Sequence, residues 1–97
     1  MSYVMLYTTE VSPESVNQLE DLRAKFMEIY NEHGVKVIGH WKQADNERVS
    51  YYMTQYENEA DYRSKVQKLH NDPRYIELTS QLDKIRTESI AKKLVPV

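Results

Sequence analysis

Apolar residues in the first third of the chain recur with the period of an amphipathic helix. Between residues 13 and 33 they lie three or four positions apart and form one stripe, which comprises Val16, Leu19, Leu22, Phe26 and Ile29. The segment is preceded by Ser12-Pro13-Glu14, which combines a capping serine with a proline suited to the first helical position. It is followed by Gly34, and glycine is favoured just after a helix end. The pattern predicts a helix over residues 13–33.

Three segments around this helix have the residue types and the two-residue period of β-strands: residues 3–9, 35–42 and 48–56. Residues 44–47 form a polar turn between the last two. Within 35–42, strict alternation predicts that Gly39 and Trp41 share the face of Val37, and that His40 lies on the opposite face. A glycine inside a strand indicates a bulge or the close approach of another group, either a ligand or the ring of Trp41.

The second half of the chain contains two further helix starts. Asn58 is a favourable N-cap for a helix that ends near His70, and Asp72-Pro73 begins a short third helix. Residues 85–94 are predicted to form the last strand. The order β-α-β-β-α-α-β is that of an α+β, ferredoxin-like split βαβ sandwich with a four-stranded antiparallel sheet. We expect a single domain over residues 1–97.

The strands are apolar on both faces, which has a consequence for assembly. Helices of a ferredoxin-like domain cover one face of its sheet, so the other face needs a second partner. The same face of a second copy supplies one, since most oligomers are symmetric homo-oligomers. The sequence therefore predicts a homodimer formed through the sheet.

Composition removes several classes of function. The net charge of -2 arises from 13 basic and 15 acidic residues that are spread along the chain, so we expect neither nucleic acid nor a membrane surface as a partner. No apolar run is long enough to span a bilayer and no leader pattern is present, so a soluble cytoplasmic protein is expected. Cysteine is absent, and His33, His40 and His70 lack metal-ligand spacing, so we predict no metal site and no cofactor. Haem remains open, because a single axial histidine needs no spacing.

With this order of elements, the chain resembles the NIPSNAP family, small domains of the dimeric α/β-barrel type. Four segments carry the resemblance: residues 33–41, Tyr52-Met53 with Tyr56-Glu57-Asn58, Asn71-Asp72-Pro73-Arg74-Tyr75, and Glu88-Ser89. The resemblance implies two ferredoxin-like protomers that press their sheets together. It implies no particular reaction, because many members have no assigned one and fold alone does not set function. Related dimeric barrels include cofactor-free monooxygenases, haem-degrading enzymes and small isomerases, an analogy only.

His40 is the candidate catalytic residue, since a histidine in a strand beside a glycine can face a cavity and exchange a proton near neutral pH. His33 and His70 lie at helix ends, where a capping or dipole-stabilising role is the simpler interpretation. Four other residues are candidates for a ligand pocket, with Glu88 expected to be buried: Trp41, Tyr51, Tyr52 and Glu88. The alternative is that they only pack in the core or at the dimer seam.

Two functional hypotheses follow. In the first, each protomer holds a small, mostly apolar, aromatic or quinone-like molecule, and acts as a cofactor-independent oxygenase or isomerase with His40 as acid or base. In the second, the protein is a non-catalytic homodimeric interaction module. A cavity beside His40, Tyr51 or Tyr52 that is large enough for a ring favours the first, and a solid core favours the second.

Overall fold

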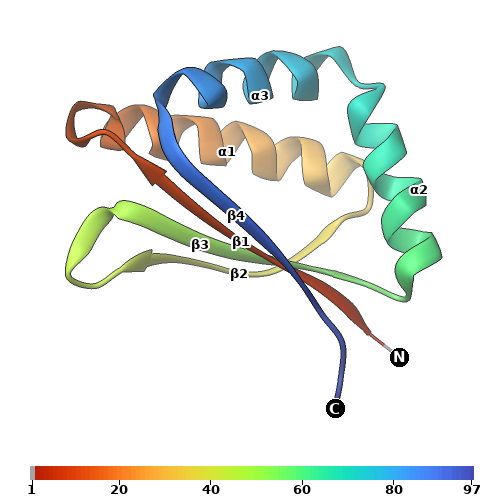
Figure 1. The fold of residues 1–97 in the computed structure, drawn as a ribbon. Coiled ribbons are helices and arrows are strands. Elements are labelled where there is room, and N and C mark those ends of the chain that lie inside the picture. The colour runs from red at the N-terminus through yellow and green to blue at the C-terminus, as the bar shows by residue number, and fades with distance from the viewer. Residues whose placement is uncertain (1) are drawn as a thin grey trace.

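The computed structural model describes residues 2–97 as one antiparallel sheet with helices on one face (Figure 1). Its elements are β1 (Tyr3–Val11), a 3-10 turn (Pro13–Ser15), α1 (Val16–Glu32), β2 (Lys36–Gln43), β3 (Asn46–Tyr56), α2 (Glu59–His70), α3 (Pro73–Ile85) and β4 (Arg86–Leu94). The strand order is β2-β3-β1-β4, and every neighbouring pair is antiparallel. The predicted fold class and element order are confirmed. The third helix, expected to be short, has 13 residues, against 12 in α2.

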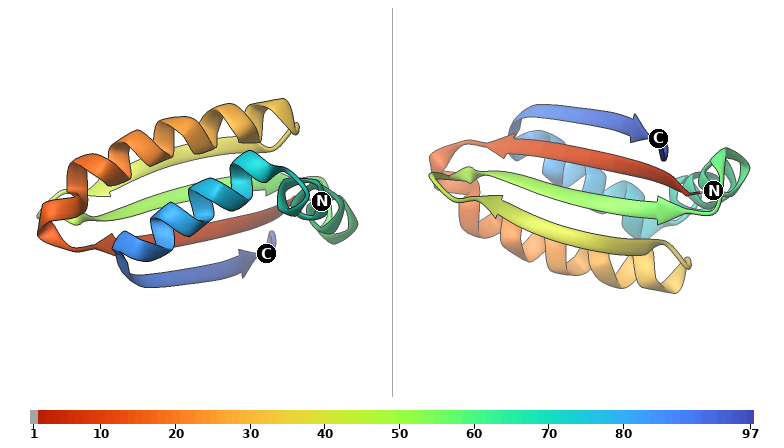
Figure 2. Two further views of the ribbon diagram at one scale, coloured as in Figure 1. Left: turned by 90° about the horizontal axis from the view of Figure 1, so that it is seen from above. Right: turned by 90° about the horizontal axis from the view of Figure 1, so that it is seen from below.

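Helices α1 and α3 lie side by side over the sheet, and α2 stands at one end of it (Figures 1 and 2). The core between these layers is built from the buried stripe of α1, Leu78 and Leu82 of α3, and alternate residues of β1 and β3. The view from below in Figure 2 shows no helix over the opposite side of the sheet. We call this side the open face; register places on it Val4, Leu6, Thr8, Trp41, Tyr51, Met53, Ile90 and Leu94.

The start and end of α1 follow the predicted signals with one difference. Ser12 does not cap the helix through its side chain, because its hydroxyl pairs with that of Ser15 at 2.9 Å. At the other end, Gly34 has a positive φ of 70°, the left-handed conformation that glycine adopts without steric cost. Val35 then donates its N–H to the carbonyl of Tyr30 at 2.8 Å and the chain enters β2.

A β-bulge in β2 corrects the predicted faces of that strand. Val37 pairs with Thr54 and Gly39 with Met53, so one extra residue, Ile38, stands between them. An extra residue reverses the alternation that follows it. His40 therefore lies on the helix side together with Val37, while Gly39 and Trp41 lie on the open face. The prediction from strict alternation, that Val37 shares a face of the sheet with Gly39 and Trp41, is wrong.

Gly39 is required by the ring that lies over it. A Cβ built on Gly39 would lie 2.0 Å from Cη2 of Trp41, far closer than two carbon atoms can approach. Both sequence interpretations of this glycine, a bulge and a close fit under Trp41, are thus observed at the same position.

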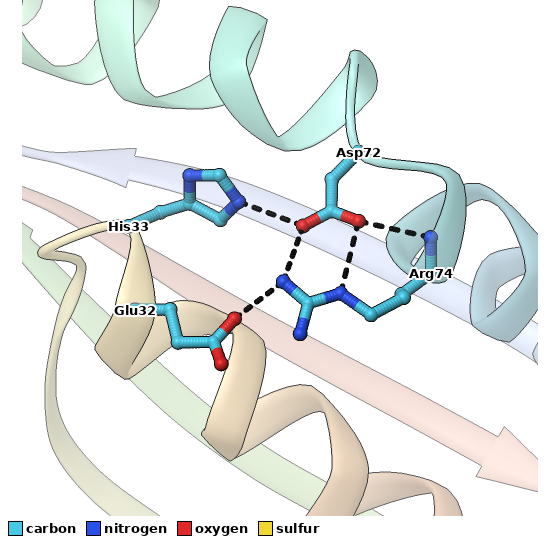
Figure 3. A network of polar contacts seen from close by, with 4 residues as sticks. All are labelled: Glu32, His33, Asp72 and Arg74. Atoms are coloured by element: carbon cyan, nitrogen blue, oxygen red, sulfur yellow. Dashed lines mark hydrogen bonds and ion pairs between the residues drawn. The ribbon is translucent and has the colours of Figure 1, made fainter.

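An ionic network joins the end of α1 to the start of α3 (Figure 3). The Nε2 atom of His33 lies 2.9 Å from Oδ2 of Asp72, and Asp72 also accepts the backbone N–H of Arg74 at 2.9 Å as the N-cap of α3. The guanidinium of Arg74 bonds both Asp72 and Glu32. The Arg74 guanidinium and then the His33 ring hold the pKa of the Asp72 carboxyl well below its ordinary value. His33 is therefore a structural residue that ties two helices together.

Replacing Asp72 with Asn should lower the melting temperature at neutral pH, because asparagine still caps the helix but no longer pairs with Arg74. The folded-state pKa of Asp72 lies below its unfolded value of about 3.9, so its contribution is present above that pH and is lost as pH falls further. The gap in melting temperature between wild type and Asp72→Asn should narrow below about pH 4. Calorimetry at four pH values measures it, with Asp21→Asn on the exposed side of α1 as the control. A gap that does not narrow in acid would contradict this assignment.

Candidate ligand-binding site

Tyrosines gather between the sheet and the helices. Of the eight in the chain, all except Tyr51 lie on the helix side of the sheet or on the helices that face it. At the centre, the rings of Tyr7 and Tyr52 stack at 4.6 Å between centroids, and Tyr30 lies 6.2 Å from Tyr52. Aromatic rings in these arrangements attract one another beyond their buried area. Most tyrosines of the chain thus pack in the layer between the sheet and the helices.

Hollows open on the helix side of the sheet, and one of about 220 Å³ lies beside Tyr56 and Tyr62. Two others border α1. The first, which we call the tyrosine cavity, has a volume of about 180 Å³ and is lined by Tyr7, Tyr30, Tyr52 and Tyr75. The second, the histidine cavity, has a volume of about 310 Å³ and is lined by His40 with α1 residues that include Leu19. A cavity of about 150 Å³ is sufficient for benzene in a protein core. Both hollows therefore have room for a single aromatic ring.

Arg23 of α1 lines both cavities. Its side chain is only 3% exposed, Nη2 donates to Oγ1 of Thr9 at 2.9 Å, and the guanidinium carbon lies 4.3 Å from the ring centre of Tyr52. Among residues 2–97, Nε of Arg23 has no hydrogen-bond partner and no carboxylate lies within ion-pair distance of the guanidinium. A buried ion without a counterion costs several kcal/mol. Arg23 is thus the most unusual charged group in the described structure.

The cavity tyrosines are hydrogen-bond donors rather than charged groups. Burial, and then the neighbouring tyrosines, raise the pKa of Tyr7, Tyr30 and Tyr75 above the ordinary value. The hydroxyls of Tyr30 and Tyr52 lie 3.3 Å apart, so one donates to the other. Tyr7, Tyr30 and Tyr75 can therefore offer neutral O–H groups to a bound oxygen atom at neutral pH.

His40 lies at the rim of the histidine cavity, on the same side of the sheet as its cross-strand partner Tyr52. The residue as a whole is exposed, but partial burial of its ring, and then the charge of Arg23, lower the pKa of His40. A neutral imidazole is the form that can accept a proton from a ligand.

The structure brings together some of the sequence-predicted site residues and separates others. Tyr52 is buried in the tyrosine cavity, and Trp41 borders the histidine cavity while its ring packs over Gly39 on the open face. Tyr51 also lies on the open face, where its hydroxyl donates to Oε1 of Gln43 at 2.9 Å. Glu88 is exposed on the edge strand β4, so the expectation that it is buried is wrong for the protomer.

Arg23 was missed by the sequence analysis although its spacing carried a signal. It lies four residues after Leu19 and three before Phe26, which places it on the apolar stripe of α1. A charged residue within a buried stripe is rare unless it is paired.

Comparison with known proteins rests on structure alone, since no family model matches the chain and no curated protein is a significant match. A crystal structure of a NIPSNAP family protein from Agrobacterium tumefaciens superposes with a TM-score of 0.89 over 100% of this chain and 94% of the other, at 17% identity. An uncharacterized NIPSNAP domain protein from Burkholderia xenovorans gives 0.86 over 98% and 94%, at 15% identity. This chain has the NIPSNAP fold. The resemblance inferred from sequence is therefore confirmed at the level of the fold.

A second group of similar structures belongs to proteins that are not named as NIPSNAP proteins. SnoaB from Streptomyces nogalater, described as a cofactor-independent oxygenase, superposes with a TM-score of 0.79 over 98% of this chain and 92% of its own, at 10% identity. At such identities the likeness extends to the fold and not to the chemistry. Within residues 2–97, no three acidic or histidine side chains converge as a metal site. No helix of that region has the length and apolar character needed to cross a bilayer.

The ionisation of His40 tests the geometry of the two cavities. Its imidazole should titrate below 6.5, and Arg23→Met should raise the midpoint, because one of the two causes of the shift is removed. Nitrogen-15 NMR of the histidine rings measures this, with Lys25→Met, on the exposed side of α1, as a charge-matched control that leaves the midpoint unchanged. A midpoint that does not respond to Arg23→Met would show that the two groups are not close.

Proposed function

We propose that this protein binds a small, mostly apolar, aromatic or quinone-like molecule between the sheet and the helices of each protomer. The observation that carries the proposal is a pair of cavities that both border Arg23, one lined by tyrosines and the other by His40. Ligand sites are concave and mostly apolar, with a few polar groups that orient the ligand. The two cavities favour this proposal over the interaction-module hypothesis.

The arrangement suits proton transfer from a weakly acidic phenol or carbon acid. His40, held neutral, would take the proton on a ring nitrogen, and the electron pair would remain on the ligand as a phenolate or enolate. Un-ionised tyrosine hydroxyls would donate to the developing oxygen anion, as donors do in oxyanion holes. Return of the proton to another carbon gives an isomerisation, whereas reaction of the electron-rich anion with dioxygen gives an oxygenation. Both reactions share the first step.

His40→Ala should lower turnover of a phenolic or quinol substrate by about 10²- to 10⁴-fold, the usual contribution of a general acid or base. Oxygen uptake and substrate absorbance, measured over a panel of phenols and hydroquinones, supply the assay. His70→Ala is the matched control and should leave turnover intact, because His70 stacks on Tyr75 but lines neither the tyrosine cavity nor the histidine cavity. A His40→Ala protein that melts far below wild type would make His40 a structural residue instead.

The open face supports the second part of the proposal, a symmetric homodimer. Trp41, Ile90 and Leu94 are exposed there by 51%, 41% and 37%, which is unusual for a face that remains in water. Glu10 and Glu88 lie at one end of this face and Lys36 lies at the other, whereas Lys92 lies in the same cross-strand row as Met53. A second copy turned end for end would set Glu10 and Glu88 opposite Lys36 and bring the two central regions together.

Met53→Lys should convert this dimer to a monomer, because Met53 lies at the middle of the open face and an interface would bury the new charge without a partner. Light scattering after size-exclusion chromatography at micromolar concentration measures the mass. Asn17→Lys on the exposed side of α1 is the control that should remain dimeric. A wild-type protein that runs as a monomer would refute the dimer and leave the cavities unaffected.

A further inference from the structure

The guanidinium of Arg23 is buried, charged and almost without partners. Arginine stays protonated in proteins and presents five N–H donors in a planar fork. Within the described residues, Thr9 provides the one acceptor for this fork, at 2.9 Å from Nη2, and Nε has none. Glu20, three residues earlier on α1, also lines the histidine cavity, but it is exposed and lies 3.6 Å from Lys42. Residues 2–97 thus provide no ion-pair partner for a cation whose exposure is 3%.

The position of this cation argues against a purely structural role. Arg23 borders both the tyrosine cavity and the histidine cavity, so this cation lies beside the space that a ligand would occupy. The ring of Tyr52 below it partly stabilises the charge but cannot accept the in-plane N–H bonds. Arg86 also lines the tyrosine cavity, but it differs from Arg23 because it forms an ion pair with Asp83.

We propose that Arg23 is the counterion for an anionic group of the ligand, so that the molecule bound between sheet and helices is an aromatic monoanion, with a carboxylate as the best fit. A carboxylate accepts two parallel N–H bonds from the guanidinium fork. Its aromatic ring would occupy the tyrosine cavity, whose volume is about 180 Å³. This inference rests on the proposed function and specifies the chemical class of its ligand.

Calorimetric titration with a matched pair of probes tests the inference. The probes are 4-hydroxybenzoate and 4-hydroxybenzamide, which have nearly the same shape but differ in charge, at pH 7 and constant ionic strength. The acid should bind wild type about 10- to 100-fold more tightly than the amide, as expected for hydrogen bonds to a charged group. Arg23→Met should bind both probes equally, and Arg23→Lys should keep a part of the preference. Lys25→Met, which removes a cation from the exposed side of α1, should retain the full preference.

The stability of the ligand-free variants separates a binding role from a structural one. Arg23→Met should melt at or above the wild-type temperature, because it removes an uncompensated buried charge and keeps an apolar chain of similar length. Two outcomes overturn the inference alone: equal affinity of wild type for the two probes, or a preference for the acid that persists in Arg23→Met. A failure of both probes to bind at millimolar concentration overturns the proposed function as well. A large loss of stability in Arg23→Met would make Arg23 a structural residue.

Discussion

The burial of one guanidinium is the constraint on which the helix side of this protein depends. Arg23 projects from the apolar stripe of α1 into a layer of tyrosines, and this layer must accommodate a charge that the chain does not neutralise. The ring of Tyr52 and the hydroxyl of Thr9 stabilise the guanidinium in part. Aliphatic side chains at these positions could not stabilise a charge. A buried charge without a counterion costs folding free energy, and such groups are typical of functional sites, since polar groups are otherwise buried together with their partners.

The β-bulge and the tyrosines place the other groups of the proposed site on the same side of the sheet as Arg23. Without the extra residue at Ile38, strict alternation would place His40 on the open face and the cavity rim would lack a base. The rings of Tyr7 and Tyr52 stack on each other at the centre of the layer, and a hollow remains beside them. The two sides of the sheet therefore differ: the helix side holds His40, a cation and hydroxyl donors, and the open face holds the exposed apolar side chains through which we propose that a second copy binds.

Sequence patterns predicted the architecture well and the site only in part. The stripe of α1, the caps at Asn58 and Asp72, and the order of elements depend on local rules, and the structure agrees with them. The predicted assignment of β2 residues to the two faces of the sheet was wrong, because a bulge interrupts the two-residue period and cannot be located from that period alone. Glu88 was misplaced because its exposure depends on the edge position of β4 in the sheet. Arg23 was overlooked because its lack of a counterion is a property of three-dimensional packing, although its place in the stripe was visible.

The side-chain NMR resonances of the Arg23 guanidinium test the central claim most directly, because they report on the cation for which the described residues provide no counterion. In a proton–nitrogen NMR titration with 4-hydroxybenzoate, the Nη–H resonances should move strongly as charge-assisted hydrogen bonds form. The Nε–H of Arg48, already bonded to the carbonyl of Val11 at 2.9 Å, should stay in place and serve as the internal reference. A resonance of Arg23 that does not move at saturating ligand would contradict the claim that its buried charge exists to hold an anion.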